Sequence, residues 1–235
     1  MRKHTAFELF SDPQIRAIRR RMVVWGRENF TLYPWRVETD PWLTFLSEFF
    51  LQRTRASQVE EFFNEFKARY PSARSFVEGG TEAVSFVTNR LGLHWRGPLL
   101  AAIAEDVFKR GGTPPENHED LMQYTGVGMY TASAWLSLHR GKRAAIIDAN
   151  VVRWLSRMTG MPYNRDPRGL KWAQNLCQRL TPERIFRDYN YAVLDFTMNL
   201  CVIKDPQCSK CPFPRYCRFG KLSLSKCYDV REDSD

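Results

Sequence analysis

The stretch that decides the fold is Tyr124-Thr125-Gly126-Val127-Gly128-Met129-Tyr130-Thr131-Ala132. Two glycines one residue apart permit a tight turn with positive φ. The turn joins two helical stretches, and backbone amides at the start of the second would point outward, where the helix dipole helps them hold a phosphate. Taken alone, the two glycines are more typical of an ordinary turn between helices. The flanking sequence therefore has to distinguish a phosphate-binding hairpin from an ordinary turn.

The flanking sequence is helical nearly throughout. Apolar residues recur at helical spacing after Asp12-Pro13, after Asp40-Pro41 and from Val59 to Phe66. Residues 29–36 break the pattern at Pro34. Shorter helices are expected over 81–90 and 98–109, and helices resume near residues 116, 130, 150, 170 and 182. No sustained strand alternation is present, so we predict an all-α protein.

Composition narrows the class of function. The chain has 235 residues, is 43% hydrophobic and carries a net charge of +9. An excess of Lys and Arg is typical of proteins that bind a polyanion such as nucleic acid, while residues 228–235 form an acidic tail. No run of about 18 apolar residues is present, so we expect no membrane span. The N-terminus has no apolar signal core. We therefore expect a protein that is not secreted and is cytoplasmic or, in a eukaryote, nuclear.

Four of the six cysteines crowd into one short stretch. Cys201, Cys208, Cys211 and Cys217 have the spacing C-x6-C-x2-C-x5-C. Four thiolates this close fit either a [4Fe–4S] cluster or a structural zinc ion, and their chemistry does not separate the two. Basic residues are interleaved with them, so the loop is also a candidate phosphate contact, mainly through Lys204 and Lys210. Cys177 and Cys227 are expected to be spare thiols.

The hairpin and its flanks resemble a known family. Gly126-Val127-Gly128 followed by Thr131-Ala132, with Asp148 at the start of a later helix, is similar to the helix-hairpin-helix glycosylases of base-excision repair. The resemblance runs from roughly Tyr33 to Cys217. It includes endonuclease III, adenine DNA glycosylase and the mismatch-specific thymine glycosylase.

The resemblance implies a mode of DNA binding and two inorganic cofactors. It implies a base flipped out of the duplex and a hairpin that grips backbone phosphate through Gly126, Val127, Gly128 and Thr131. The cysteine spacing is that of the family's iron–sulfur loop, which favours a [4Fe–4S] cluster over zinc. In several relatives hairpin carbonyls hold a monovalent cation, and the matching carbonyls here are those of Met122, Tyr124 and Val127.

Asp148 is the first catalytic candidate. Breaking an N-glycosidic bond builds positive charge on the sugar, which a nearby carboxylate stabilises while it orients or deprotonates a water. The resemblance places Asp148 at that sugar. A helix N-cap is the alternative role for an aspartate in this position. Asn150 is expected to help orient the carboxylate.

Glu48 is the second catalytic candidate, because it lies on or beside an apolar helix face, where an unpaired charge is expensive. Its alternative role is a solvent-facing residue on an amphipathic helix. The stretch 46–54 resembles a helix of adenine and thymine mismatch glycosylases in which a glutamate contacts the extruded base. Gln52 matches the side chain that fills the vacated space in the stack. Pro34-Trp35-Arg36 also resembles those families, or it forms a packed aromatic corner.

Tyr130 indicates which type of glycosylase within this family the chain resembles. In the family's bifunctional lyases this position is a lysine that forms a Schiff base with the sugar, and a phenol cannot do so. Adenine glycosylases typically have a serine here, and a tyrosine resembles the thymine mismatch glycosylases. The alternative is a core tyrosine that follows a turn. The chain also stops soon after the cysteine loop, whereas typical adenine glycosylases continue into a second domain.

The leading hypothesis is a monomeric, monofunctional DNA glycosylase that removes thymine or uracil mispaired with guanine in double-stranded DNA. A short adenine glycosylase and a non-catalytic DNA-binding protein on the same fold are the alternatives. The expected fold has two lobes with a DNA cleft between them. Residues 30–143 would form a helical barrel with the hairpin. Residues 1–29 and 144–227 would form a second helical lobe with the cluster loop, followed by the tail at 228–235.

Overall fold

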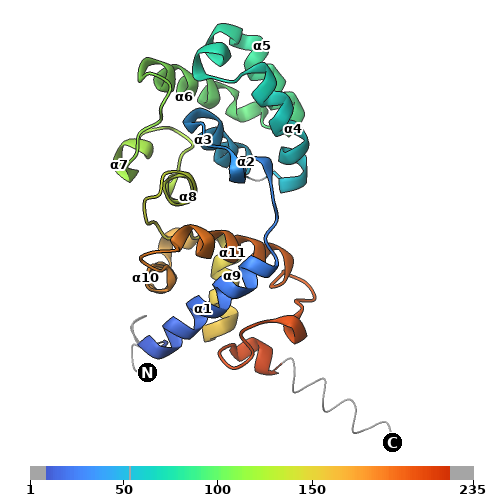
Figure 1. The fold of residues 1–235 in the computed structure, drawn as a ribbon, viewed down its shortest axis with the longest axis vertical. Helices are drawn as coiled ribbons and strands as arrows, with labels where there is room; N and C mark the ends of the chain where they lie inside the picture. The colour runs from blue at the N-terminus through green and yellow to red at the C-terminus, as the bar shows by residue number, and fades with distance from the viewer. Residues whose placement is uncertain (1–8, 53, 223–235) are drawn as a thin grey trace, which may run out of the picture. The chain divides into compact units, whose positions relative to one another are not determined.

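The computed structural model describes residues 9–52 and 54–222, and these residues form helices and turns without any strand (Figure 1). The prediction of an all-α protein is confirmed for this part of the chain. Cys227 and the acidic tail lie outside the described residues. The chain divides into two compact units: unit 1 comprises Met1–Thr31 and Arg143–Asp235, and unit 2 comprises Leu32–Lys142. The helices of the described part include none that is both long and apolar enough to span a membrane.

Unit 2 is one continuous segment of chain. Its helices are α2 (Pro34–Val37), α3 (Pro41–Phe50), α4 (Ala56–Arg69), α5 (Ala73–Leu91), the 3-10 turn η2 (His94–Arg96), α6 (Gly97–Lys109), α7 (His118–Leu121) and α8 (Met129–His139).

Two elements of unit 2 differ from the sequence prediction. The break expected at Pro34 is instead the first residue of the short helix α2, because proline suits a first helical turn. The helix expected from residue 81 begins at Ala73, and Gly80 kinks it with a φ of 52°. The kink at Gly80 explains why the sequence predicted only the part of α5 that follows it.

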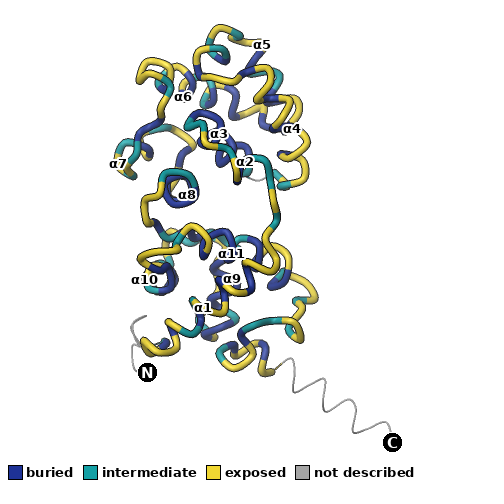
Figure 2. Tube along the Cα trace, viewed as in Figure 1, coloured by how far each residue is buried: buried dark blue, intermediate teal, exposed yellow. Residues whose placement is uncertain are grey.

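The core of unit 2 is rich in phenylalanine. Phe50, Phe62 and Phe66 are fully buried and contact one another with ring centroids 5.0 to 5.7 Å apart. At the start of the unit, Trp35 and Arg36 are buried, and the ring of Trp35 stacks on that of Tyr33. Pro34-Trp35-Arg36 therefore forms the packed aromatic corner. Along α8 every residue from Thr131 to Leu138 is buried (Figure 2).

Unit 1 combines the beginning of the chain with its end. Its helices are α1 (Asp12–Glu28), α9 (Ala149–Thr159), the 3-10 turn η3 (Pro167–Gly169), α10 (Lys171–Leu180), α11 (Phe186–Asn199) and the 3-10 turn η4 (Cys208–Lys210). Trp25 of α1 meets Phe196 of α11 edge to face at 5.3 Å. Gly26 lies so close to Ala192 that a side chain there would collide with it. Because Gly26 has no side chain, α1 can pack closely against α11, which lies more than 150 residues later in the chain.

Candidate active site and cysteine centre

The predicted site residues divide between the two units. Unit 2 contains the hairpin together with Glu48, Gln52 and Tyr130, and unit 1 contains Asp148, Asn150 and the cysteines.

The hairpin has the geometry that its glycines predict. Gly126 has a φ of 89°, which favours glycine, and an added Cβ would lie 3.1 Å from Leu99 Cδ1. Gly128 is the N-cap of α8 and supplies no capping side chain. No atom lies within 4 Å of the Cβ position at Gly128. An approaching anion therefore meets backbone amides at this helix start without a side chain in the way.

Gln52 lies directly after α3 and is tied to the hairpin. Its Nε2 donates to Thr131 Oγ1 at 2.8 Å and to the Gly126 carbonyl at 3.3 Å. The buried guanidinium of Arg96 donates to the Gln52 carbonyl at 3.3 Å. Gln52 and Thr131, both predicted to contact DNA, are therefore hydrogen-bonded to each other. A Gln52 that fills a vacated position in the stack has to leave these two acceptors first.

The remaining hairpin residues differ in burial and in hydrogen bonding. Tyr130 lies in the first turn of α8 and is half-buried, whereas Val127 is buried. Of the carbonyls proposed to hold a monovalent cation, that of Tyr124 accepts from the Val127 amide at 3.0 Å. The Tyr124 hydroxyl donates to Asp106, and burial together with this hydrogen bond raises the pKa of the phenol. The cation site stays a prediction.

Each carboxylate oxygen of Asp148 has a different hydrogen-bond partner. Oδ1 accepts from the Val151 amide at 2.8 Å, so Asp148 is the N-cap of α9. Oδ2 accepts from Asn150 Nδ2 at 3.0 Å. Burial raises the pKa of the Asp148 carboxyl, although the hydrogen bonds from Val151 and Asn150 and the charge of Arg153 act in the opposite direction. A carboxylate with a raised pKa is a better proton acceptor than an exposed aspartate.

Arg153 links Asp148 to the cysteine loop. Its Nη1 donates to Asn150 Oδ1 at 2.8 Å, its Nε donates to the Cys201 carbonyl at 3.0 Å, and its Nη2 donates to the Thr197 carbonyl at 2.7 Å. Asn150, which holds Asp148, is thereby fixed to the segment that carries the cysteines. Arg153 was not among the predicted site residues. The signal for it was a charge inside the apolar run 151–155, the same kind of signal that singled out Glu48.

Glu48 is buried in unit 2 and paired with a histidine. Oε1 of Glu48 lies 2.8 Å from Nε2 of His139, and the two side chains are 3% and 1% exposed. Glu48 is therefore not a residue on a solvent-facing side of its helix. His139 was not singled out from the sequence, because nothing in the local sequence pairs it with a residue 91 positions earlier.

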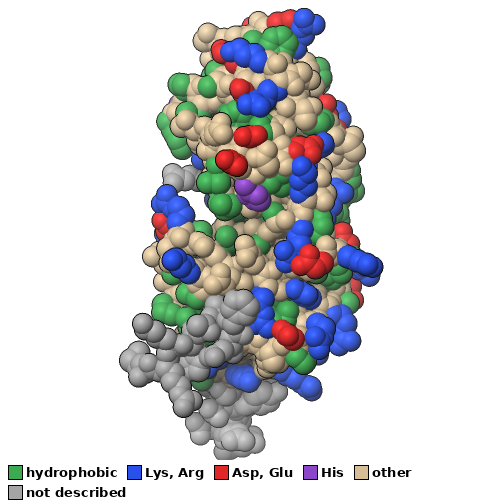
Figure 3. All heavy atoms as spheres, turned by 90° about the vertical axis from the view of Figure 1, so that its left-hand side faces the viewer, with side chains coloured by type: hydrophobic (Ala, Val, Ile, Leu, Met, Phe, Trp, Pro, Cys, Tyr) green, Lys and Arg blue, Asp and Glu red, His purple; other side chains and the backbone are tan. Residues whose placement is uncertain are grey.

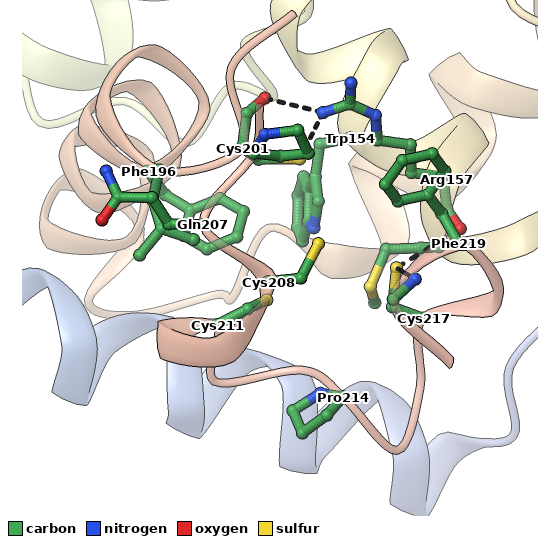
Figure 4. Close-up of a pocket in the computed structure, with 14 residues that line it drawn as sticks. Trp154, Arg157, Phe196, Cys201, Gln207, Cys208, Cys211, Pro214, Cys217 and Phe219 are labelled. Atoms are coloured by element: carbon green, nitrogen blue, oxygen red, sulfur yellow. Dashed lines mark hydrogen bonds between the residues drawn. The ribbon is translucent and has the colours of Figure 1, made fainter. Parts of the chain in front are cut away.

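All four clustered cysteines line one pocket of unit 1 (Figure 4). Aromatic rings from outside the loop complete its wall, with Trp154 from α9 and Phe196 from α11. Arg157 Nη1 donates to Cys201 Sγ at 3.4 Å, and the Gly220 amide donates to Cys217 Sγ at 3.3 Å. Within the described chain, no three His, Cys, Asp or Glu side chains are grouped to hold a metal ion.

The donor set fits a thiolate-bound metal centre. Burial raises the pKa of Cys208, Cys211 and Cys217, that of Cys211 to about 12. Thiols in such surroundings become thiolates only when a cation compensates them. Cys177 differs, because it is buried in the core and donates to the Ile146 carbonyl at 3.2 Å. Lys204 and Lys210 are exposed on the cysteine loop.

Comparisons with known proteins show which proteins the chain resembles in sequence and fold. No protein-family model matches the chain. The thymine/uracil-DNA glycosylase of Pyrobaculum aerophilum is 32% identical over 76% of this chain and 80% of its own length. The thymine-DNA glycosylase of Aeropyrum pernix is 31% identical over 89% and 97%. A solved structure titled as a thermostable thymine-DNA glycosylase superposes with a TM-score of 0.83 and 27% identity, covering 90% of this chain and 98% of that one.

The fold and the hairpin define a class, the helix-hairpin-helix DNA glycosylases. An endonuclease III bound to DNA shares the fold, with a TM-score of 0.76 at 19% identity. Within that class, the chain belongs to the thymine/uracil-DNA glycosylase family. The human adenine DNA glycosylase is 28% identical over 91% of this chain, but the match spans only 41% of that protein.

Proposed function

We propose that the chain is a monofunctional DNA glycosylase that hydrolyses the N-glycosidic bond of thymine or uracil mispaired with guanine. Asp148 carries the proposal. It is held by Asn150 and by the α9 amide, and its pKa is raised by burial. It stabilises the positive charge that develops on the sugar and accepts a proton from the attacking water. The named activities of the relatives supply the substrate class.

Tyr130 supports the absence of lyase activity. It occupies the first turn of α8, directly after the hairpin. A lyase needs an amine there that attacks the sugar and forms a Schiff base, and the phenol has no such nitrogen. The proposed product is therefore an intact strand with an abasic site.

The cysteine pocket is proposed to hold a [4Fe–4S] cluster through Cys201, Cys208, Cys211 and Cys217. Four neighbouring thiolates fit either a cluster or a zinc ion, and the spacing C-x6-C-x2-C-x5-C, which resembles the family's iron–sulfur loop, favours the cluster. The N–H groups of Arg157 and Gly220, which donate to Cys201 Sγ and Cys217 Sγ, would stabilise sulfur bound to such a cluster. The cluster supplies structural order to the loop that carries Lys204 and Lys210, and bond cleavage does not involve it.

The proposal is tested with matched duplexes. The duplexes contain T or U opposite G, or A opposite G or 8-oxoguanine. Each duplex is incubated with the protein under single-turnover conditions, and half of each reaction is then treated with hot alkali. We expect T and U to be excised, with strand breaks only after alkali. Excision of A alone would establish the adenine glycosylase, and binding without excision would establish a DNA-binding protein.

Borohydride trapping tests the absence of lyase activity separately. Borohydride should trap no covalent adduct with the wild type but should trap one with Tyr130→Lys. Efficient trapping of the wild type would contradict a monofunctional enzyme.

A further inference from the structure

The indole N–H of Trp154 is a buried donor without an acceptor. Trp154 lies in α9 and is 2% exposed, and its Nε1 has no hydrogen-bond partner among the described residues. Its ring packs against those of Phe196 and Phe213, with a centroid separation of 5.8 Å to each. A buried donor that makes no hydrogen bond loses its hydration without compensation, so such a group in a native protein needs an explanation.

Trp154 faces the cysteine pocket. Figure 4 shows its indole extending from α9 into the space among the four clustered cysteines, with the nitrogen toward Cys208. Apart from the cysteines, the lining has two polar side chains. Arg157 has donors only, and Gln207 is exposed and donates to the Asn199 carbonyl at 3.5 Å. Cysteine sulfur is therefore the acceptor that the pocket offers to the indole.

Three of the four cysteine sulfurs already have an N–H donor. These donors are Arg157 Nη1 for Cys201, the Phe213 amide for Cys211 and the Gly220 amide for Cys217. Cys208 Sγ has no donor within the part of the chain that the structure describes. The sulfur that lacks a donor and the donor that lacks an acceptor, Trp154 Nε1, therefore line the same pocket.

Sulfur that is bound to iron is a stronger acceptor than the sulfur of a thiol. A protonated cysteine is only a weak acceptor, whereas a thiolate carries negative charge and takes a charge-assisted hydrogen bond. Reduction adds further negative charge to an iron–sulfur cluster, and hydrogen bonds to its sulfurs are among the factors that set its reduction potential. A buried N–H that reaches such a sulfur therefore favours the reduced form.

We propose that the Trp154 indole N–H donates to the Cys208 sulfur when the pocket holds a [4Fe–4S] cluster, and that this hydrogen bond stabilises the reduced cluster. This role rests on the proposed cluster and adds a residue that sets its reduction potential. With Trp154 as the fourth donor, each of the four cysteine sulfurs accepts an N–H, and the indole is no longer a buried donor without a partner.

The test compares the midpoint potential of Trp154→Phe with that of the wild type, in an anaerobic redox titration of the full chain with its cluster. Phenylalanine keeps an aromatic ring against Phe196 and Phe213 but removes the N–H. Loss of the bond should lower the midpoint potential, so that at the wild-type midpoint the ratio of reduced to oxidised cluster falls about 3-fold or more. The direction separates two causes, because water that entered the space left by the smaller ring would raise the potential instead.

Trp172→Phe is the matched control for the loss of an indole N–H. Trp172 of α10 also has a buried Nε1 without a partner among the described residues, and it packs against the core of unit 1 without lining the cysteine pocket. This variant should keep the wild-type midpoint potential. An unchanged or raised midpoint in Trp154→Phe would overturn the proposal, and so would an equal fall in Trp172→Phe.

Pulsed EPR of the wild-type protein tests the bond without a substitution, so it decides the question even if Trp154→Phe loses its iron. The chain has seven tryptophans, and Trp154 is the one among the residues that line the pocket. With ¹⁵N at every indole nitrogen and the cluster in a paramagnetic state, we expect coupling to one indole nitrogen. Absence of coupling would overturn the proposal, and zinc in place of iron would overturn it together with the cluster. Failure of the proposed activity looks different, because the wild type would then excise neither T nor U while the midpoint shift and the coupling remained.

Discussion

Asp148 combines two functions that a substitution can separate. Oδ1 caps α9 through the Val151 amide, and Oδ2 is oriented by Asn150. Asparagine caps a helix about as well as aspartate does, but it carries no charge. Alanine loses both functions. A comparison of Asp148→Asn with Asp148→Ala therefore distinguishes a catalytic carboxylate from a structural cap.

We predict that Asp148→Asn loses at least about 10²-fold in single-turnover excision rate, the range typical of a positioned acid–base group. Its DNA affinity and thermal stability should stay close to those of the wild type. Asp148→Ala should lose a similar factor in rate and, in addition, about 0.5–2 kcal/mol of stability through the lost cap. Full activity in Asp148→Asn would reduce the residue to a cap, and the catalytic group would then be sought at Glu48.

The raised pKa of Asp148 predicts a pH dependence. Catalysis needs the ionised form, and burial shifts the ionisation of this carboxyl above its ordinary value of 3.8. As pH falls through the raised pKa, the carboxylate is protonated and the excision rate should fall about tenfold per pH unit. The acid limb of the rate profile should therefore lie above the usual range of aspartate. The residual rate of Asp148→Asn should lack this limb, and an unchanged limb in that variant would assign the ionisation to another group.

The cysteine loop depends on arginines of one helix. Arg153 and Arg157 of α9 donate to the Cys201 carbonyl, and Arg157 also donates to the carbonyls of Val202 and Ile203. These bonds fix the loop where it leaves α11. Phe213, which is fully buried, and the hydrogen bond from Arg21 Nη1 to the Pro212 carbonyl hold the loop further along, and a metal centre bound by the four thiols would add to this order.

We predict that Cys211→Ser lowers both the iron content and the thermal stability of the purified protein, because ligand binding and local folding are coupled. The wild type should be brown, with broad absorption near about 400 nm. Cys177→Ser is the matched control, since its hydroxyl can still donate to the Ile146 carbonyl, and it should retain the wild-type iron content. Stoichiometric zinc without iron in the wild type would reject the cluster.

The order and type of the elements were largely predictable from the sequence, and the exceptions have local causes. Apolar spacing located the longer helices, because each buries one face against a core. The start of α5 was missed, since Gly79-Gly80 resembles a helix boundary in sequence and the kink at Gly80 lies inside the helix. The short helix α2 was missed because four residues are too few to show a period.

The candidate site was predictable only where a local pattern carries it. The hairpin and the cysteine spacing are contiguous motifs, so the sequence alone locates them. The partners that hold the site side chains are not contiguous: His139 reaches Glu48 across 91 positions, and Thr131 reaches Gln52 across 79. Such pairings depend on how helices pack, and one sequence does not contain that information.

At the scale of the whole molecule, positive charge is the feature that relates to DNA. The net charge is +9, and Lys and Arg side chains are spread over the face in Figure 3. Basic residues that neutralise phosphates release condensed counterions, with about 0.9 ion released per phosphate on duplex DNA. Affinity therefore has to depend on salt.

We predict that DNA binding weakens by about 10³-fold between 50 and 200 mM salt if roughly six phosphates are contacted. Lys204→Ala and Lys210→Ala should each reduce the slope of log affinity against log salt by about 1. Lys109→Ala is the control, because Lys109 lies at the end of α6, outside the hairpin and the cysteine loop. An affinity that does not change with salt would contradict DNA as the partner.

The docking of α1 on α11 has a consequence for how the protein is made. A ribosome releases α1 first, but the partner of α1 is encoded more than 150 residues later. Unit 2 is continuous and can fold as soon as Lys142 has emerged, whereas α1 cannot complete its packing until α11 has emerged. We predict that in nascent chains stalled at increasing lengths, unit 2 resists protease before α1 does. Protection of α1 in chains that stop before α11 would contradict this order. Folding during synthesis would thus begin in the continuous unit and finish when α1 docks on α11.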